Sequence, residues 1–216
     1  MYEVALSLLK KINQLGYEAY IVGGYPRDMY MGIPSTDIDI CTSMLPDRIE
    51  KNFSIVESHS EYGSFVIEEG QFQFEVTTYR RDYYINNRYP KIEFVDSLKE
   101  DLNRRDFTMN TLCIDQNGEY IDLLGARKDI DQKQIRMLGD PNMRLKEDPL
   151  RMIRALRFAS DFNFEIEKSL YESMIQNRKL LTTLSLSRIK KEMIKIRNQK
   201  KWNEWIQLLD LSSYLP

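Results

Sequence analysis

Two aspartates separated by one apolar residue, Asp37 and Asp39, are the residues of this chain whose spacing most clearly suggests chemistry. Side chains of a β-strand alternate between its faces, so a strand over residues 36–41 places both carboxylates on one face and Ile38 and Ile40 in the core. Neighbouring carboxylates repel each other unless a cation neutralises them, and Mg²⁺ prefers one or two carboxylates together with phosphate oxygens. The pair predicts a magnesium site acting on a phosphate; the alternative is a capping aspartate beside a surface aspartate.

A double glycine, Gly23-Gly24, precedes the aspartates and could hold that phosphate. Glycine lets the backbone approach an anion closely, and a helix beginning near Pro26 would direct its unpaired N–H groups toward it. Arg27 and Asp28 follow at once. In combination with the aspartate pair, these residues favour phosphate binding over an ordinary turn, and we assign Gly24 and Arg27 to nucleotide binding.

A third carboxylate, Glu75, lies in an alternating segment over residues 71–79. Phe72, Phe74 and Val76 share one face of the predicted strand, which leaves Glu75 on the other face. If this strand lies beside the aspartate strand, Glu75 could help to hold two metal ions for displacement at phosphorus. A cross-strand salt bridge explains the same position equally well.

Three arginines and an aspartate recur every third residue in the segment 147–158, at Asp148, Arg151, Arg154 and Arg157. On one helix this spacing makes a continuous polar ridge. Cytosine and adenine both present an amino donor beside a ring-nitrogen acceptor, so Asp148 can accept from the amino group while Arg151 donates to the ring nitrogen. Uracil and guanine reverse this polarity and would be rejected. A simple amphipathic helix with a basic face would explain the arginines alone.

The remaining sequence predicts elements that position these residues. Helical spacing with a terminal glycine predicts a helix over residues 4–15, and apolar alternation predicts strands. Asn117-Gly118 predicts a two-residue hairpin loop. Residues 80–91 are polar, aromatic and aperiodic, which predicts a long mobile loop. From about residue 143 the periodicity is helical throughout, with helices expected over 147–161, 167–177, 186–198 and 201–211.

Composition narrows the class of protein. The two cysteines are far apart in sequence, so neither a disulfide framework nor a zinc cluster is indicated, and a reducing compartment such as the cytoplasm is expected. No apolar run reaches membrane-spanning length. The net charge of −2 conceals an uneven distribution: residues 1–143 carry 16 basic and 24 acidic side chains, and residues 144–201 carry 15 and 7. This asymmetry favours catalysis in the first part and polyanion contact in the second.

Three segments together resemble the motifs of class II tRNA nucleotidyltransferases, the polymerase β-like branch that contains bacterial CCA-adding enzymes and poly(A) polymerases. They are the combined glycine and aspartate motif over residues 23–40, residues 104–110, and residues 147–158. The resemblance implies that Arg105, Asp106 and Asn110 bind the sugar and triphosphate, a role suited to arginine and to hydrogen-bonding side chains. It also implies that Asp148 and Arg151 contact the base, that Arg154 and Arg157 help to bind the nucleotide, and that Glu75 is catalytic.

The resemblance implies an α+β fold with a nucleotidyltransferase head over residues 1–140 and a helical neck over 141–216. It further implies addition of C and A to a tRNA lacking part or all of its 3′ CCA, from CTP and ATP, with Mg²⁺ held by Asp37 and Asp39. The alternatives are a poly(A) polymerase, partial CC addition, and a nucleotide- or RNA-binding fragment without turnover. No membrane partner is expected.

Two features depart from the family pattern. The chain ends about where the neck of the family ends, so it could be a truncated form, a half-protein completed by a separate body and tail chain, or a minimal enzyme. Many relatives also have glutamate at the position of Ser187. These departures leave full tRNA handling open.

Overall fold

The computed structural model describes residues 1–84, 90–208 and 211–212. Its contacts divide the chain into two compact units. The sheet unit comprises residues 1–83, 91–105 and 109–127, and the helical unit comprises residues 84–90, 106–108 and 128–216. Residues 128–140, which the sequence analysis placed in the head, thus make their contacts within the helical unit.

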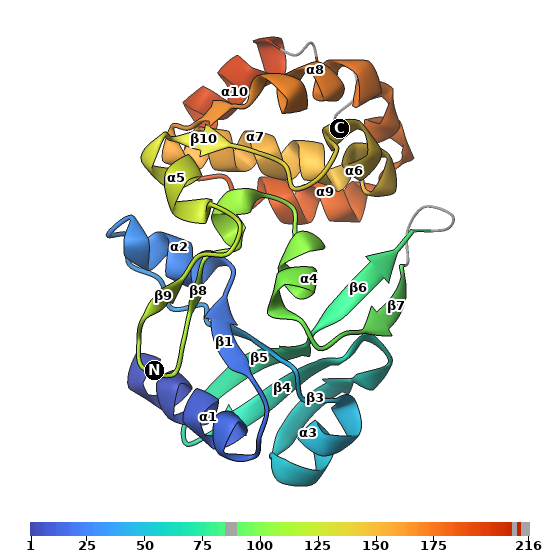
Figure 1. The fold of residues 1–216 in the computed structure, drawn as a ribbon. Helices are drawn as coiled ribbons and strands as arrows, with labels where there is room; N and C mark the ends of the chain where they lie inside the picture. Colours follow the sequence, from blue (N-terminus) through green and yellow to red (C-terminus); the bar gives the residue numbers. More distant parts are fainter. Residues whose placement is uncertain (85–89, 209–210, 213–216) are drawn as a thin grey trace. The chain divides into compact units, whose positions relative to one another are not determined.

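A seven-stranded mixed sheet forms the centre of the sheet unit (Figure 1). Only β2 and β5 pair in parallel among its strands, and the other neighbours are antiparallel. In spatial order the strands are β3 (Ile55–His59), β4 (Ser64–Glu69), β5 (Phe72–Thr78), β2 (Asp39–Thr42), β1 (Ala19–Val22), β8 (Cys113–Ile114) and β9 (Tyr120–Ile121).

Helices cover both faces of this sheet. Helices α1 (Tyr2–Gln14) and α3 (Pro46–Asn52) share one apolar cluster with β1, β2, β4 and β5. Helix α4 (Leu98–Asn103) packs against the opposite face through Leu98 and Leu102. Both faces of β2 are thereby buried, which fixes the strand that begins at Asp39.

The other elements of the sheet unit surround this core. Helix α2 (Gly24–Tyr30) follows β1 directly, and strands β6 (Arg80–Tyr83) and β7 (Lys91–Phe94) form a separate antiparallel hairpin. Short 3₁₀ helices occupy Ser60–Tyr62 and Thr108–Asn110.

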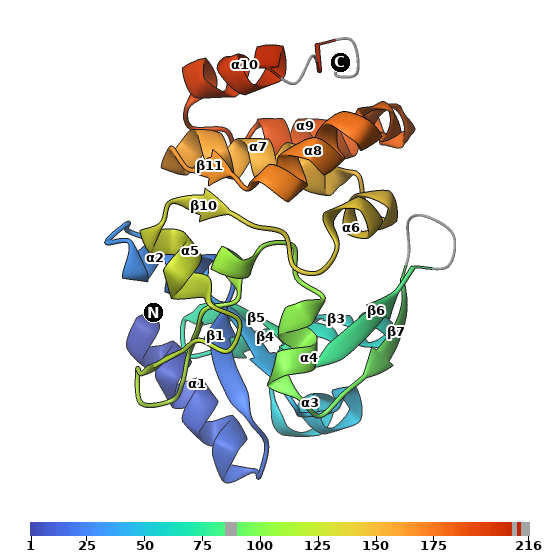
Figure 2. The same ribbon diagram turned by 45° about the horizontal axis from the view of Figure 1, so that its top comes forward.

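Helix α7 (Leu150–Phe162) is the centre of the helical unit and packs against α6 (Pro141–Glu147), α9 (Leu186–Met193) and α10 (Gln199–Leu208) (Figure 2). Its buried apolar residues recur at helical spacing. Around these helices lie α5 (Ala126–Asp131), β10 (Gln134–Ile135), β11 (Glu165–Ile166), α8 (Lys168–Asn177) and the 3₁₀ helix Arg178–Thr183. Within the described residues, no helix is both long and apolar enough to cross a membrane.

The α+β class is confirmed, and so are most of the predicted elements. The predicted first helix corresponds to α1, and the alternating segment forms β5 with Phe74 and Val76 buried and Glu75 exposed. The hairpin at Asn117-Gly118 is present as β8 and β9, but its loop has three residues, because Asp115 and Glu119 still pair by a backbone hydrogen bond. Local periodicity thus located these elements correctly.

Other predictions were wrong in detail. Strand β2 begins at Asp39, so Asp37 lies before the strand. Residues 80–83 form β6 rather than a loop, because they pair with β7, while residues 85–89 of the predicted loop lie outside the described residues. The predicted helix over 147–161 is interrupted: α6 ends at Glu147 and α7 begins at Leu150, since proline at 149 disfavours a helical conformation in the residue before it.

Candidate active site

Asp39 occupies the position in the sheet that brings two predicted carboxylates together. It is the first residue of β2, paired with Val22 of β1 on one side and with Glu75 of β5 on the other. Ile38 is buried as predicted, and Asp37 is exposed just before the strand. The parallel pairing of β2 with β5 therefore places Glu75 beside Asp39. The alternation of residues in β5 was compatible with this arrangement but did not by itself predict it.

The electrostatics of Asp39 show that the carboxylates interact. Burial, followed by the negative charges of Asp37 and Glu75, raises the pKa of Asp39 to about 6, and Arg105 opposes this rise. A cation at this position would relieve the repulsion. Among the residues that the structure describes, no three His, Cys, Asp or Glu side chains are grouped closely enough to hold a metal ion by themselves. Asp37 and Asp39 fit a metal that takes its other ligands from substrate phosphate and water.

Gly23 is the glycine that this site requires. Its φ of 85° is in the region that favours glycine, and a Cβ there would lie 3.2 Å from Oδ2 of Asp39. Gly24, the predicted binding residue, begins α2, and a Cβ at Gly24 would make only an ordinary contact of 3.5 Å with Arg27. The tight backbone therefore lies against the carboxylate of Asp39, one residue before the predicted position.

Arg27 and Asn110, both predicted to bind the nucleotide, contact each other in the interior of the sheet unit. The Nη1 group of Arg27 donates to Oδ1 of Asn110, and its Nε donates to Oδ1 of Asp28 at 2.8 Å. All three side chains are buried. These contacts anchor the start of α2 to the end of the segment 104–110.

A polar cavity of about 380 Å³ opens beside Asp39 within the sheet unit. Three predicted site residues, Asp39, Glu75 and Arg105, contribute to its wall. The other lining residues are Val22, Ile40, His59, Tyr62, Ser64, Thr77, Arg80 and Arg104. Carboxylates and guanidinium groups thus face the same space, which suits a metal-bound phosphate.

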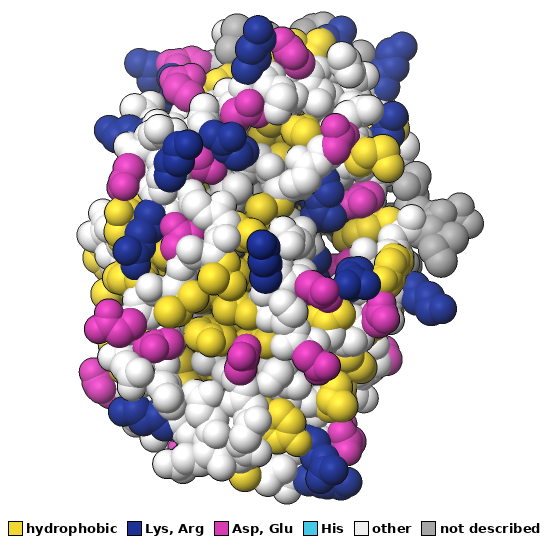
Figure 3. All heavy atoms as spheres, in the orientation of Figure 1, with side chains coloured by type: hydrophobic (Ala, Val, Ile, Leu, Met, Phe, Trp, Pro, Cys, Tyr) yellow, Lys and Arg dark blue, Asp and Glu magenta, His cyan; other side chains and the backbone are white. Residues whose placement is uncertain are grey.

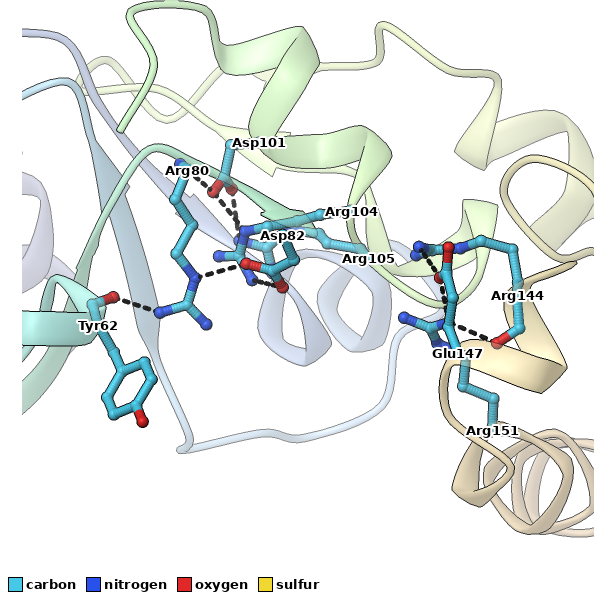
Figure 4. A network of polar contacts seen from close by, with 9 residues as sticks. All are labelled: Tyr62, Arg80, Asp82, Asp101, Arg104, Arg105, Arg144, Glu147 and Arg151. Atoms are coloured by element: carbon cyan, nitrogen blue, oxygen red, sulfur yellow. Dashed lines mark hydrogen bonds and ion pairs between the residues drawn. The ribbon is translucent and has the colours of Figure 1, made fainter. Parts of the chain in front are cut away.

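A network of charged side chains holds the basic wall of this cavity (Figure 4). The buried carboxylate of Asp101 accepts from Nε of Arg104 at 2.8 Å and from Nη2 of Arg105 at 3.1 Å. Arg80 pairs with Asp82, with 3.2 Å between Nε and Oδ1. Burial alone would raise the pKa of Asp101, but the two arginines outweigh it and the pKa is lowered. A stable anion therefore fixes the position of Arg105.

Most residues of this network were not predicted from the sequence. Arg80 and Asp82 were included in a predicted loop, and Asp101 lies in helix α4, which was not predicted. The available signal was the charged cluster at residues 80–82 immediately after an apolar strand, together with Arg104 at the start of the segment 104–110.

In the helical unit, Asp148 lies at the junction between α6 and α7 rather than on the helix with the arginines. Its Oδ1 accepts from the backbone N–H of Leu150 at 3.1 Å, and Nη2 of Arg188 lies 3.0 Å from both carboxylate oxygens. The Asp148 side chain is 23% exposed, so part of the carboxylate remains accessible.

Arg151 is held close to the same junction. Its Nη1 donates to Oε2 of Glu147 at 3.0 Å and to the carbonyl oxygen of Arg144 at 2.6 Å (Figure 4). Its guanidinium carbon lies 5.6 Å from the ring centre of Tyr84, a cation–π contact. Arg151 is buried by these partners.

The remaining arginines of the ridge pair with two carboxylates from distant segments. Nε of Arg154 donates to Oδ2 of Asp106 at 2.7 Å, and Nε of Arg157 donates to Oε2 of Glu192 at 2.9 Å. Glu192 also contacts Arg154, with 3.3 Å between Oε1 and Nη1. The structure thus joins Asp106 and Arg154, two predicted site residues, while Glu192 and Arg188 were not predicted.

Comparisons with known proteins place the chain in a family. A family model described as "Poly A polymerase head domain" matches residues 19–136. The chain belongs to this family. A second model, described as "Probable RNA and SrmB- binding site of polymerase A", matches residues 163–215. Nucleotidyltransferases of the poly A polymerase head-domain family are metal-dependent.

Individual relatives support the same assignment. The chain is 39% identical to the CCA-adding enzyme of Geobacillus thermodenitrificans, covering 100% of this chain and 55% of the relative. A structure of the Bacillus stearothermophilus CCA-adding enzyme in complex with CTP matches with a TM-score of 0.92 and 36% identity, covering 100% of this chain and 54% of that one.

A more distant structure, the Thermotoga maritima CCA-adding enzyme complexed with tRNA-CCA, has a TM-score of 0.80 and 26% identity over 99% of this chain and 51% of that one. This chain therefore spans about half the length of the relatives it matches. The resemblance seen in the sequence motifs is confirmed.

Proposed function

We propose that this chain carries the nucleotidyl-transfer and nucleotide-selection parts of an enzyme that adds C and A to tRNA 3′ ends from CTP and ATP. The observation that carries the proposal is the grouping of Asp39, Glu75 and Arg105 around one polar cavity. In this proposal the head spans residues 1–140, which include the whole sheet unit, and the neck spans residues 141–216. The similarity to CCA-adding enzymes, one of them in complex with CTP, supports the choice of substrates.

In the proposed reaction the 3′-hydroxyl of the tRNA attacks the α-phosphorus of the nucleotide. The new phosphodiester bond forms as the bond to the β-phosphate breaks, pyrophosphate leaves, and the hydroxyl proton is released. Asp37 and Asp39 would hold Mg²⁺, which when bound activates the attacking oxygen and neutralises charge on the phosphates. Arg105, fixed by Asp101, stabilises phosphate charge in the cavity, and Glu75 contributes negative charge beside Asp39.

Selection of the base is the proposed role of Asp148 and Arg151. The accessible carboxylate of Asp148 accepts from the amino group of cytosine or adenine, and Arg151 donates to the ring nitrogen in exchange for one of its present partners. Uracil and guanine would place a carbonyl against the carboxylate. The proposed cellular location is the cytoplasm, consistent with two buried free cysteines.

Incorporation of labelled nucleotide into a tRNA that lacks its CCA end tests the proposal. CTP alone should add C, and CTP with ATP should add a terminal A, with no incorporation from UTP or GTP. Asp39→Asn is the inactive control. Long runs of A from ATP alone would indicate a poly(A) polymerase instead, and nucleotide binding without incorporation would indicate a binding module.

A further inference from the structure

Arg188 of helix α9 holds the carboxylate that the proposed function uses to select the base. Asp148 has extended backbone dihedrals between two helices, so helix geometry does not fix its side chain. Its carboxylate is oriented by the N–H of Leu150 and by Nη2 of Arg188. Within the described residues, Asp148 is also the only side-chain partner of Arg188.

Helix α9 contacts the polar ridge at a second point on the same face. Glu192 lies one helical turn after Arg188, and it binds Arg154 and Arg157. Arg188 thus contacts the acidic residue of the ridge, Asp148. Glu192 contacts two of its basic residues, Arg154 and Arg157. Ser187, in the first turn of the same helix, is exposed and carries no charge.

We propose that Arg188 is a positioning residue for nucleotide selection, acting through Asp148. An ionised carboxylate can accept about four hydrogen bonds. The contacts with Leu150 and Arg188 leave lone pairs for the amino group of cytosine or adenine, and they hold the carboxylate in one orientation. Selectivity depends on that orientation, because a carboxylate free to rotate could turn away from the carbonyl of uracil and cease to exclude it.

This inference rests on the proposed function, and binding of nucleotides to the present chain tests it without tRNA. The affinities for CTP and UTP would be measured by calorimetry in the presence of Mg²⁺ for the unmodified chain, Arg188→Gln and Arg188→Lys. Arg188→Gln should reduce the CTP to UTP affinity ratio by about tenfold or more, the order expected for a charge-assisted hydrogen bond. Arg188→Lys should retain part of the ratio.

Lys191→Gln is the matched control, since Lys191 is exposed on the same helix and loses the same charge. It should leave the ratio unchanged. Asp148→Asn provides the second test: if Arg188 acts through Asp148, adding Arg188→Gln to Asp148→Asn should change the ratio by less than about twofold. Unchanged melting temperatures would separate positioning from a general loss of structure.

Three outcomes are distinguishable. If the unmodified chain does not prefer CTP over UTP, the proposed function itself is wrong. If it does, and folded Arg188→Gln keeps the same ratio, the positioning role is wrong. If Arg188→Gln binds CTP more tightly, Arg188 blocks the base site rather than shaping it, and the inference is overturned.

Discussion

Replacing Asp39 by asparagine should remove nucleotide addition and at the same time stabilise the metal-free protein. The folded state raises the pKa of Asp39 from 3.8 to about 6, through burial and the charges of Asp37 and Glu75. A shift of about 2 units corresponds to about 3 kcal/mol of unfavourable ionisation in the folded state. Because the side chain is only partly buried, solvent screening reduces the expected gain to about 1–2 kcal/mol.

The sign of the pH dependence follows from the direction of the shift. Between about pH 4 and pH 6 the folded protein binds more protons at Asp39 than the unfolded chain does, so this residue lowers stability as the pH rises through that window. Asparagine does not titrate. The free-energy difference between Asp39→Asn and the unmodified chain should therefore be largest above pH 6 and should shrink toward pH 4.

Urea unfolding with a chelator present, at pH 7.5 and pH 4.5, measures this difference. Added Mg²⁺ should then stabilise the unmodified chain by about 1.4 kcal/mol at ten times its dissociation constant and stabilise the variant less. Asp96→Asn, which changes an exposed carboxylate, should alter stability by less than about 0.5 kcal/mol. The reasoning fails if Asp39→Asn is no more stable than the unmodified chain at pH 7.5, or if its advantage persists unchanged at pH 4.5.

Four other results are expected. Arg151→Ala should weaken discrimination between CTP and UTP more than triphosphate affinity, and unchanged rejection of UTP would exclude a base contact. Replacing residues 85–89 by two glycines should preserve C addition and impair A addition; equal loss of both would indicate a scaffold role. Glu192→Gln should cost about 3 kcal/mol in urea unfolding, because two largely buried arginines lose their shared anion, while the exposed Glu204→Gln should cost little. Affinity for tRNA should be weak with a shallow salt dependence, because internal carboxylates pair several arginines of residues 144–201; a steep slope would refute this.

The surface supports the last of these predictions. Figure 3 shows basic and acidic side chains interspersed over the visible face, including the helical elements. Ion pairs inside the helical unit neutralise part of the positive charge of residues 144–201. Examples are Arg144 with Glu147 and Arg188 with Asp148. The formal charge of residues 144–201 therefore overstates the positive charge that is available to bind the phosphates of a nucleic acid.

The sequence by itself determined which side chains each single helix or strand presents on its faces. The alternation of residues 71–79 placed Glu75 on the polar face of its strand, and apolar spacing defined α1. The aspartate pair and the arginine ridge identified candidate ligands, because side-chain type and local spacing suffice to show which groups an element presents.

Only the tertiary structure decided which of these groups meet. The pairing of Asp39 with Glu75 depends on a parallel register between strands that are not consecutive in the chain. The contact of Arg154 with Glu192 spans 38 residues, and that of Asp148 with Arg188 spans 40. Helix α4 and strand β6 escaped prediction because the contacts that hold them come from other segments: Asp101 of α4 accepts from the backbone N–H of Arg80 and from Nε of Arg104, and β6 pairs with β7. Such contacts depend on the packing of whole elements, which local periodicity does not encode.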